Sequence, residues 1–387
     1  MEILEVLTAE VRSEETQHGG IDQDFDIPGA LKREYNPFLG PFPCTGWGLE
    51  ETTMRVSVII NSKAGSVDEA LIREKIQEAL FRCDLRFVSP KTLDELERFA
   101  AEEIGLSRYF MICGGDGTIN RTLQSLVRMA AGAELPPICL IRSGTANDLA
   151  AQLGISRKIE KAARCILEGG IKKIDLIEIE TDRGEKTVMI TNGGVGIPAI
   201  IAGEANRFRR MLKDSSANGK LPWAFRFLAK QSDGLVKKMG SGVYMMMVAE
   251  ALRQWTPMDW EVEMELPGRE PFSTKASCIL VNNQPRLGSS ITPAPFTSNT
   301  DGLMNVLVTE AHTVKDQLKA VMSLRRGRPH ELAMNRSYEV SELRLRSKEG
   351  RRPLTFFGDG EILLKDAREI RVRCVHQGLS VVVGQEC

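Results

Sequence analysis

The chain contains no apolar run long enough to cross a membrane as a helix, which takes about 20 residues. Its N-terminus also lacks the basic stretch and the apolar stretch of a secretory leader. None of its 8 cysteines forms a Cys-x-x-Cys pair or shows metal-ligand spacing, which favours reduced thiols. A net charge of -1 gives no reason to expect a nucleic-acid partner. We therefore expect a cytoplasmic protein whose membrane contact, where it occurs, is peripheral.

The 387 residues suffice for two domains with cores of their own, and the sequence pattern changes twice along them. Residues 1–53 are acidic and then rich in proline and glycine, which is typical of an extended or weakly ordered arm. Strand-like and helix-like segments alternate over residues 54–180, which predicts a doubly wound parallel sheet. Strands with apolar–polar alternation predominate over residues 181–373, which predicts a mainly antiparallel, β-sandwich-like second domain.

Periodicity also predicts the elements within each domain. In the first we expect strands at 55–60, 85–88, 109–112 and 138–141, and helices at 67–81, 93–104, 119–130 and from 147. In the second we expect strands at 176–179, 187–191, 260–266, 276–281, 303–309, 343–345 and 354–357.

Three polar loops follow strands of the first domain and should lie together where parallel strands end. They are Asn61 to Ser66, the glycine-rich run Cys113 to Asn120, and Ser143 to Leu149. Glycine lets the backbone approach an anion closely, and a helix N-terminus adds a favourable dipole. Each loop alone is better explained as a turn or a helix cap, but three at one edge predict a phosphate-binding site. Asp116 is expected there as a ligand of metal or water.

These loops resemble those of the diacylglycerol kinase catalytic-domain family, which includes bacterial lipid kinases and is related to sphingosine and ceramide kinases. Ile174 to Leu176, Thr300 to Val306 and Phe357 to Glu361 extend the resemblance over roughly residues 55–385. It implies a nucleotide-binding α/β domain followed by a β-rich lipid-binding domain. It also implies that the C-terminal strand, 374–387, returns to the first domain.

The resemblance implies ATP as the phosphoryl donor. Lys63 and Arg121 are more basic than the residues usual at their positions, but neither change removes an expected catalytic group. The residues implied to bind ATP are Asn61, Ser62, Lys63, Ala64, Gly65, Ser89, Gly115, Asp116, Gly117, Thr118, Ile119, Asn120, Arg121, Thr145, Asn147 and Asp148.

The resemblance further implies that Glu361 is the general base, assisted by Asp359, and that Asp116 and Asp175 hold catalytic Mg²⁺ through water. Carboxylates suit this role, because Mg²⁺ prefers oxygen ligands and phosphoryl transfer needs charge neutralisation. A structural Mg²⁺ would be held by the Asp301 carboxylate and the backbone carbonyls of Ser298 and Leu303. A simple Asp-Gly turn at Asp301 is the alternative.

A basic segment with interleaved bulky apolar residues lies between residues 203 and 240. This composition is typical of transient docking on an anionic membrane surface. It is equally typical of a helix that packs its apolar face on the second domain and leaves its basic face in water.

Three functions fit these residues. The leading hypothesis is an ATP- and Mg²⁺-dependent kinase of a diacylglycerol-like or sphingoid lipid, and the Asn147-Asp148 pair favours the diacylglycerol branch. The second is a kinase of a soluble substrate of the NAD kinase type, which shares the Gly-Gly-Asp-Gly-Thr loop. The third is a non-catalytic lipid-sensing pseudokinase, against which the complete set of acids argues. The oligomeric state stays open, a homodimer included.

Overall fold

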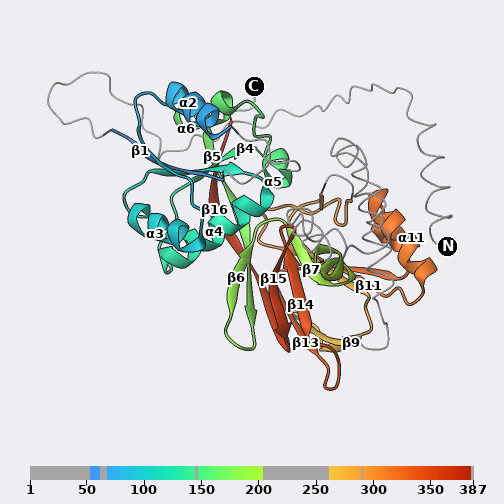
Figure 1. Cartoon of the computed structure of the whole chain (residues 1–387). Coiled ribbons are helices and arrows are strands. Elements are labelled where there is room, and N and C mark those ends of the chain that lie inside the picture. Colours follow the sequence, from blue (N-terminus) through green and yellow to red (C-terminus); the bar gives the residue numbers. More distant parts are fainter. Residues whose placement is uncertain (1–52, 62–67, 144–146, 204–260, 289–290, 385–387) are drawn as a thin grey trace, which may run out of the picture. The chain divides into compact units, whose positions relative to one another are not determined.

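Two β-sheets run through the part of the chain that the structure, a computed structural model, describes: residues 53–61, 68–143, 147–203, 261–288 and 291–384. Figure 1 shows the helices α2 to α6 gathered around the first strands of the chain, apart from the strands β13 to β15. The predicted arm lies outside the described residues except for Thr53, and the basic segment does so except for Gly203.

The first sheet begins as the expected parallel sheet, in the order β2-β1-β3-β4. Strands β1, β3 and β4 are largely buried, as their continuous apolar sequences predict, while the edge strand β2 is only partly buried. The strands are β1 (Arg55–Ile60), β2 (Asp84–Val88), β3 (Tyr109–Gly114) and β4 (Ile138–Arg142). The helices are α2 (Glu69–Ala79), α3 (Leu93–Glu103), α4 (Asp116–Ala130), α5 (Asp148–Gln152) and α6 (Ile159–Glu168).

Side-chain caps fix where α2 and α3 begin. The Asp68 carboxylate accepts a hydrogen bond from the Leu71 N–H, and the Thr92 hydroxyl accepts one from the Glu95 N–H. The alternation predicted for this domain is confirmed. However, α4 begins at Asp116 rather than at residue 119, so half of the glycine-rich run forms the first turn of a helix.

Two long strands carry the first sheet into the second domain. β5 (Gly170–Thr181) and β16 (Glu369–Val383) pair antiparallel along most of their length, and Val381 of β16 pairs parallel with Ile138 of β4. The sheet therefore continues without a break into β13 (Glu342–Ser347), β8 (Val262–Glu265) and β9 (Phe272–Thr274), while β6 (Lys186–Met189) pairs with β5.

The second sheet is antiparallel, in the order β12-β11-β10-β7-β14-β15. It packs on the antiparallel half of the first sheet, because one apolar core combines Ile177 and Ile370 with Ile279, Val306 and Phe356. This sandwich confirms the predicted fold class. The sheet contains β7 (Asn192–Gly196), β10 (Cys278–Asn282), β11 (Met304–Thr309), β12 (Asn335–Val340), β14 (Leu354–Gly358) and β15 (Glu361–Ala367); α11 (Val314–Arg325) and the short η3 (Pro329–Glu331) join β11 to β12.

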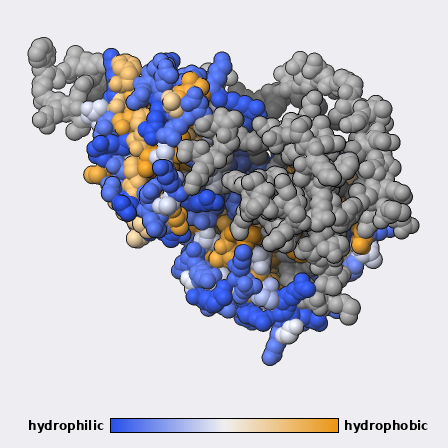
Figure 2. Space-filling model, in the orientation of Figure 1, coloured by the Kyte–Doolittle hydropathy of each residue, from blue (hydrophilic) through white to orange (hydrophobic). Residues whose placement is uncertain are grey.

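The surface shown in Figure 2 is mainly hydrophilic, with hydrophobic residues interspersed. Single exposed apolar side chains such as Phe81 and Leu106 are ordinary on a protein surface. Across the described ranges, no helix combines the length and the apolar character that a membrane span requires.

Candidate active site

The described ends of the three polar loops lie together at the carboxyl edge of the parallel strands. The Asn61 N–H donates to the Cys113 carbonyl (3.1 Å) and the Ser143 N–H to the Gly114 carbonyl (3.2 Å). The Asn61 side chain then crosses to α4, where Nδ2 donates to Thr118 Oγ1 (2.7 Å). The predicted residues Ser62, Lys63, Ala64, Gly65 and Thr145 lie outside the described residues.

The glycine-rich run owes its glycines to close packing. A Cβ on Gly114 would lie 2.4 Å from the Thr118 Cβ, so no other residue fits without movement of α4. Gly115 caps α4 without a side chain, which leaves the first N–H groups of the helix open toward an anion. Ile119 packs in the core and Arg121 is exposed, so the two side chains point to different environments.

Asp116 lies where the glycine-rich run meets the third loop. The backbone N–H groups of Asn147, Asp148 and Leu149 face its carboxylate and favour the charged form, yet burial raises the pKa of Asp116 above its usual value. Its Oδ1 is inaccessible and has no hydrogen-bond partner. The pKa of Asp148 is also raised, first by burial and then by the charge of Asp116, so two carboxylates repel each other here. Such a pair would be stabilised by a cation.

Asp359 and Gly360 form the turn between β14 and β15. Both have positive φ, 51° and 80°, as a two-residue hairpin turn of the Asp-Gly kind requires. The Asp359 carboxylate is almost fully buried and accepts hydrogen bonds from the Thr191 N–H (2.8 Å), the Thr191 hydroxyl (2.5 Å), the Ile190 N–H (3.0 Å) and Asn120 Nδ2. Burial raises its pKa against the effect of these four donors. Asp359 therefore ties the hairpin to α4.

Glu361 opens β15, directly after this turn. A Cβ on Gly117, in the first turn of α4, would lie 3.4 Å from Glu361 Oε1. The late acid and the glycine-rich run are therefore neighbours, although more than two hundred residues separate them in sequence. Asn120 of α4 makes a second link to this region, because besides the Asp359 carboxylate it also donates to the Val188 carbonyl of β6 (3.2 Å).

Asp175 belongs to a second cluster, at the turn around Asp301. It is fully buried; Oδ2 accepts from the Gly302 N–H (2.8 Å), while Oδ1 accepts from the Gln377 N–H (2.8 Å) and lies 3.0 Å from His376 Nδ1. Both oxygens are thus occupied by protein partners.

Three other predicted site residues, Asp301, Ser298 and Ser89, also have protein partners. Asp301 is exposed and accepts from the Leu303 N–H (3.0 Å), the arrangement of a simple Asx turn. Ser298 bonds within the same loop, to Thr300. Ser89 follows β2 at the expected edge, but its hydroxyl donates to Glu69 (2.5 Å) and accepts from Arg73 (3.2 Å).

Comparison with known proteins finds two family models that match consecutive parts of the chain. Residues 55–179 match the family model described as diacylglycerol kinase catalytic domain, and residues 228–383 match the one described as YegS C-terminal NAD kinase beta sandwich-like domain. The chain belongs to the diacylglycerol kinase catalytic-domain family. It is accordingly a lipid kinase.

Several relatives of this lipid kinase are known. A diacylglycerol kinase of Mycobacterium tuberculosis (strain CDC 1551 / Oshkosh) is 24% identical over 253 residues, 65% of this chain and 69% of that protein. A Salmonella arizonae protein named "Probable lipid kinase YegS" is 32% identical over 106 residues, 27% of this chain and 32% of that protein. The crystal structure of a diacylglycerol kinase from Bacillus anthracis str. Sterne superposes with a TM-score of 0.58 at 15% identity, covering 86% of this chain and 98% of that one, which shows a shared fold.

Sequence reasoning missed one element that lies beside these residues, the loop after β10. The Gly288 N–H donates to Asp148 Oδ2 (2.7 Å), and the side chain of Asn192 accepts from the N–H groups of Asn283 and Gln284. The available signal was three consecutive amide residues, Asn282 to Gln284, directly after a buried apolar strand. Polar residues at a strand end are a weak signal alone, because turns contain them too.

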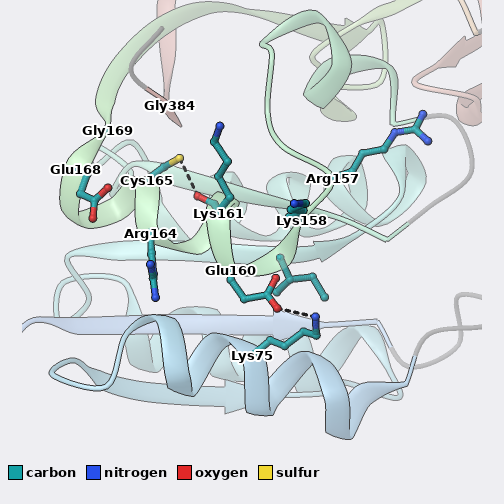
Figure 3. Close-up of a pocket in the computed structure, with 11 residues that line it drawn as sticks. Lys75, Arg157, Lys158, Glu160, Lys161, Arg164, Cys165, Glu168, Gly169 and Gly384 are labelled. Carbon is teal, nitrogen blue, oxygen red and sulfur yellow. Dashed lines mark hydrogen bonds and ion pairs between the residues drawn. The ribbon is translucent and has the colours of Figure 1, made fainter. Parts of the chain in front are cut away.

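A pocket of about 880 Å³ lies elsewhere, along α6. Figure 3 shows Lys75 of α2 paired with Glu160, and Arg157 and Lys161 directed away from the helix. None of the lining residues belongs to the lipid kinase site described above, and the ion pair with Lys75 engages Glu160. This pocket therefore lies apart from the residues around Asp116 and Glu361.

Proposed function

We propose that this lipid kinase transfers the γ-phosphoryl group of ATP to a hydroxyl group of a diacylglycerol-like or sphingoid lipid, with Glu361 as the general base. The observation that carries the proposal is the position of Glu361 Oε1 beside the first turn of α4, where a Cβ added to Gly117 would lie 3.4 Å from it. A base in that position would stand beside the helix N-terminus at which the terminal phosphates of ATP are expected.

The nucleotide side of the proposal rests on the converging loops. Backbone N–H groups at the start of α4 would hold phosphate oxygens, while Asn61 would orient the loop through Thr118. The role in ATP binding extends to the residues of the first and third loops that the sequence singled out. Ser89 would act on this edge through Glu69 and Arg73, which it joins.

The residues around Asp116 fit Mg²⁺. An orphaned buried carboxylate oxygen and a second carboxylate at Asp148, each with a raised pKa, form a hard, negatively charged oxygen site. Mg²⁺ bound there would neutralise the charge that develops on the phosphoryl oxygens. We assign Asp175 to positioning, because it holds the Asp301 turn and the irregular part of β16 through Gly302 and Gln377.

The protein groups then perform a simple exchange. As the acceptor oxygen forms its bond to the γ-phosphorus, the Glu361 carboxylate takes the hydroxyl proton. The bond from that phosphorus to the bridging oxygen breaks, and ADP leaves with the electron pair. Asp359 assists by fixing the hairpin that carries Glu361 against α4.

A lipid acceptor also requires the protein to bind its substrate at a membrane surface. We propose that the basic segment 203–240 provides a transient contact with anionic headgroups.

The test is incubation of the full chain with γ-labelled ATP, Mg²⁺ and either lipids in mixed micelles or NAD. Label in a lipid, and none in NAD, is the expected result. Label in NAD alone would replace the lipid acceptor with a soluble one, and no label despite ATP binding would indicate a pseudokinase.

Glu361→Gln should lower kcat by about 10²-fold or more and leave ATP affinity nearly unchanged, because an amide cannot take the proton. The matched control is Glu339→Gln, a glutamate of the same sheet that accepts from Asn305 (2.6 Å) on β11. Wild-type turnover in Glu361→Gln would mean that the base is another residue.

A further inference from the structure

Three buried amide side chains lie at the end of the second sheet nearest the hairpin of Glu361. This amide cluster consists of Asn192, Asn282 and Gln284, of which 0%, 0% and 1% is exposed. Asn282 pairs with Asn192 across β10 and β7, and the Asn192 carbonyl accepts from the Asp359 N–H (3.0 Å). One hydrogen bond therefore separates the amide cluster from the hairpin turn.

Carbonyl partners fix the orientation of each amide. Gln284 Nε2 and Asn192 Nδ2 both donate to the Arg286 carbonyl, at 2.9 and 2.7 Å. Asn282 Nδ2 faces the backbone and side-chain oxygens of Asn305, at 3.4 and 3.3 Å. Because the nitrogens are directed at these oxygens, the remaining atoms, Gln284 Oε1 and Asn282 Oδ1, are hydrogen-bond acceptors.

These two acceptors have no donor. Gln284 Oε1 and Asn282 Oδ1 are both inaccessible and lack a hydrogen-bond partner. Buried polar atoms in folded proteins are nearly always paired, since an unpaired one loses its hydration without compensation. A ligand that brings an O–H or N–H group would satisfy both.

The amide cluster also reaches the nucleotide side of the site. From Gln284 the chain continues through Arg286 to Gly288, whose N–H donates to Asp148 beside Asp116. The cluster thus connects the turn before Glu361 with the loop that contacts the paired carboxylates, which is where the head of an acceptor must lie.

We propose that the amide cluster binds the acceptor headgroup, and that the preferred acceptor carries a hydrogen-bond donor in addition to the hydroxyl that is phosphorylated. This inference rests on the proposed lipid phosphorylation. In a diacylglycerol the only O–H is the nucleophile, and its proton goes to Glu361, so no donor remains for Gln284 or Asn282. A monoacylglycerol offers a second O–H, and an N-acylsphingosine offers an O–H and an N–H.

The experiment compares three lipids with matched oleoyl chains at equal mole fraction in mixed micelles: 1,2-dioleoylglycerol, 1-monooleoylglycerol and N-oleoylsphingosine. Label transferred from γ-labelled ATP gives kcat/KM for each. At least one of the two donor-bearing lipids should exceed dioleoylglycerol by 10-fold or more, because a site with buried acceptors discriminates against a substrate that leaves them unpaired. Gln284→Met should remove this preference, so that the three lipids differ less in kcat/KM than they do with the wild type.

Gln317→Met is the matched control, since Gln317 is also buried and its Nε2 also donates to a backbone carbonyl, that of Ala311 (2.5 Å). It should keep the wild-type preference. If Gln284→Met unfolds at a lower temperature than this control, Asn282→Leu replaces it, because the Asn282 amide makes only long hydrogen bonds.

The possible outcomes distinguish failure of this inference from failure of the proposed lipid phosphorylation. Equal or better turnover of dioleoylglycerol by the wild type overturns the inference and leaves the lipid kinase reaction intact. If folded Gln284→Met and Asn282→Leu both keep the preference for donor-bearing lipids, the amide cluster does not bind the acceptor. Water is then the hydrogen-bond partner of Gln284 Oε1 and Asn282 Oδ1. Failure of all three lipids to accept label overturns the proposed acceptor class itself.

Discussion

Asp359→Asn should weaken the junction between α4 and the β14–β15 hairpin. In the wild type each carboxylate oxygen accepts two hydrogen bonds, Oδ1 from the Thr191 N–H and hydroxyl, and Oδ2 from the Ile190 N–H and Asn120 Nδ2. Asparagine has the same shape and tolerates the positive φ of 51°, so the backbone preference barely changes. Its NH₂ group, however, must replace one oxygen and face two donors.

The magnitude follows from those two lost bonds. A hydrogen bond to a charged group contributes roughly 1.5–3 kcal/mol, so the free energy of unfolding should fall by about 3–6 kcal/mol. The lower end is expected, for two reasons. The Thr191 hydroxyl can rotate to accept from the new NH₂, and burial already disfavours the Asp359 charge, as its raised pKa indicates.

Urea unfolding and steady-state kinetics measure both consequences. The kcat should fall by about 10²-fold, because a displacement of roughly 1 Å at Glu361 suffices for such a loss. Asp366→Asn is the control: Asp366 is exposed and also has a positive φ, 55°, so it shares the backbone change without the buried bonds. An Asp359→Asn variant with the midpoint and turnover of the wild type would refute the view that this carboxylate joins the domains.

Two further substitutions test the charges and the turn at Asp301. The raised pKa of Asp148 makes protonation stabilising: this gain is complete below the ordinary value of about 3.9 and is lost as pH rises through the raised value. Metal-free Asp148→Asn should therefore unfold at a higher temperature than the wild type at pH 7, by a margin that closes toward pH 4; a less stable variant at pH 7 would contradict the repulsion from Asp116. Gly302→Ala should lower the free energy of unfolding by about 1–2 kcal/mol, since Gly302 has φ 77° and the new Cβ would lie 3.1 Å from His376 Nδ1. Gly268→Ala, at φ 70° with no neighbour within 4 Å, should lose less in the same urea titration; equal losses would assign the cost to φ alone.

Much of the first domain was predictable because its elements carry strong periodicity. Strands such as β1 and β3 are buried on both faces and therefore read as continuous apolar runs. Helices such as α3 show one apolar stripe and begin at a capping residue, here Thr92. Local sequence and tertiary environment agree in these segments, so the sequence alone predicts both type and position.

The elements that were missed owe their structure to neighbours. β7, Asn192–Gly196, contains three glycines and has low intrinsic strand propensity, but β10 and β14 pair with it on both sides. β16 was expected only near its valine-rich end. Its first part alternates exposed arginines, Arg371 and Arg373, with buried Ile370 and Val372. Glutamates of the neighbouring strands accept hydrogen bonds from these arginines, so the stabilising pairs become recognisable only once the strand pairing is known.

The acids show where sequence reasoning about a site ends. Asp116, Asp175 and Asp359 are the same residue type in motifs of one family, and the sequence predicts a catalytic part for each. Hydrogen bonding separates them, because Asp175 and Asp359 have both oxygens engaged by protein donors while Asp116 keeps Oδ1 without a partner. A metal ion at Asp175 or Asp359 would have to displace hydrogen bonds that hold the two domains together. At Asp116 it would bind a carboxylate oxygen that has no hydrogen-bond partner in the protein. We therefore expect Asp116 to take Mg²⁺, and the other two carboxylates to determine how firmly Glu361 is held beside it.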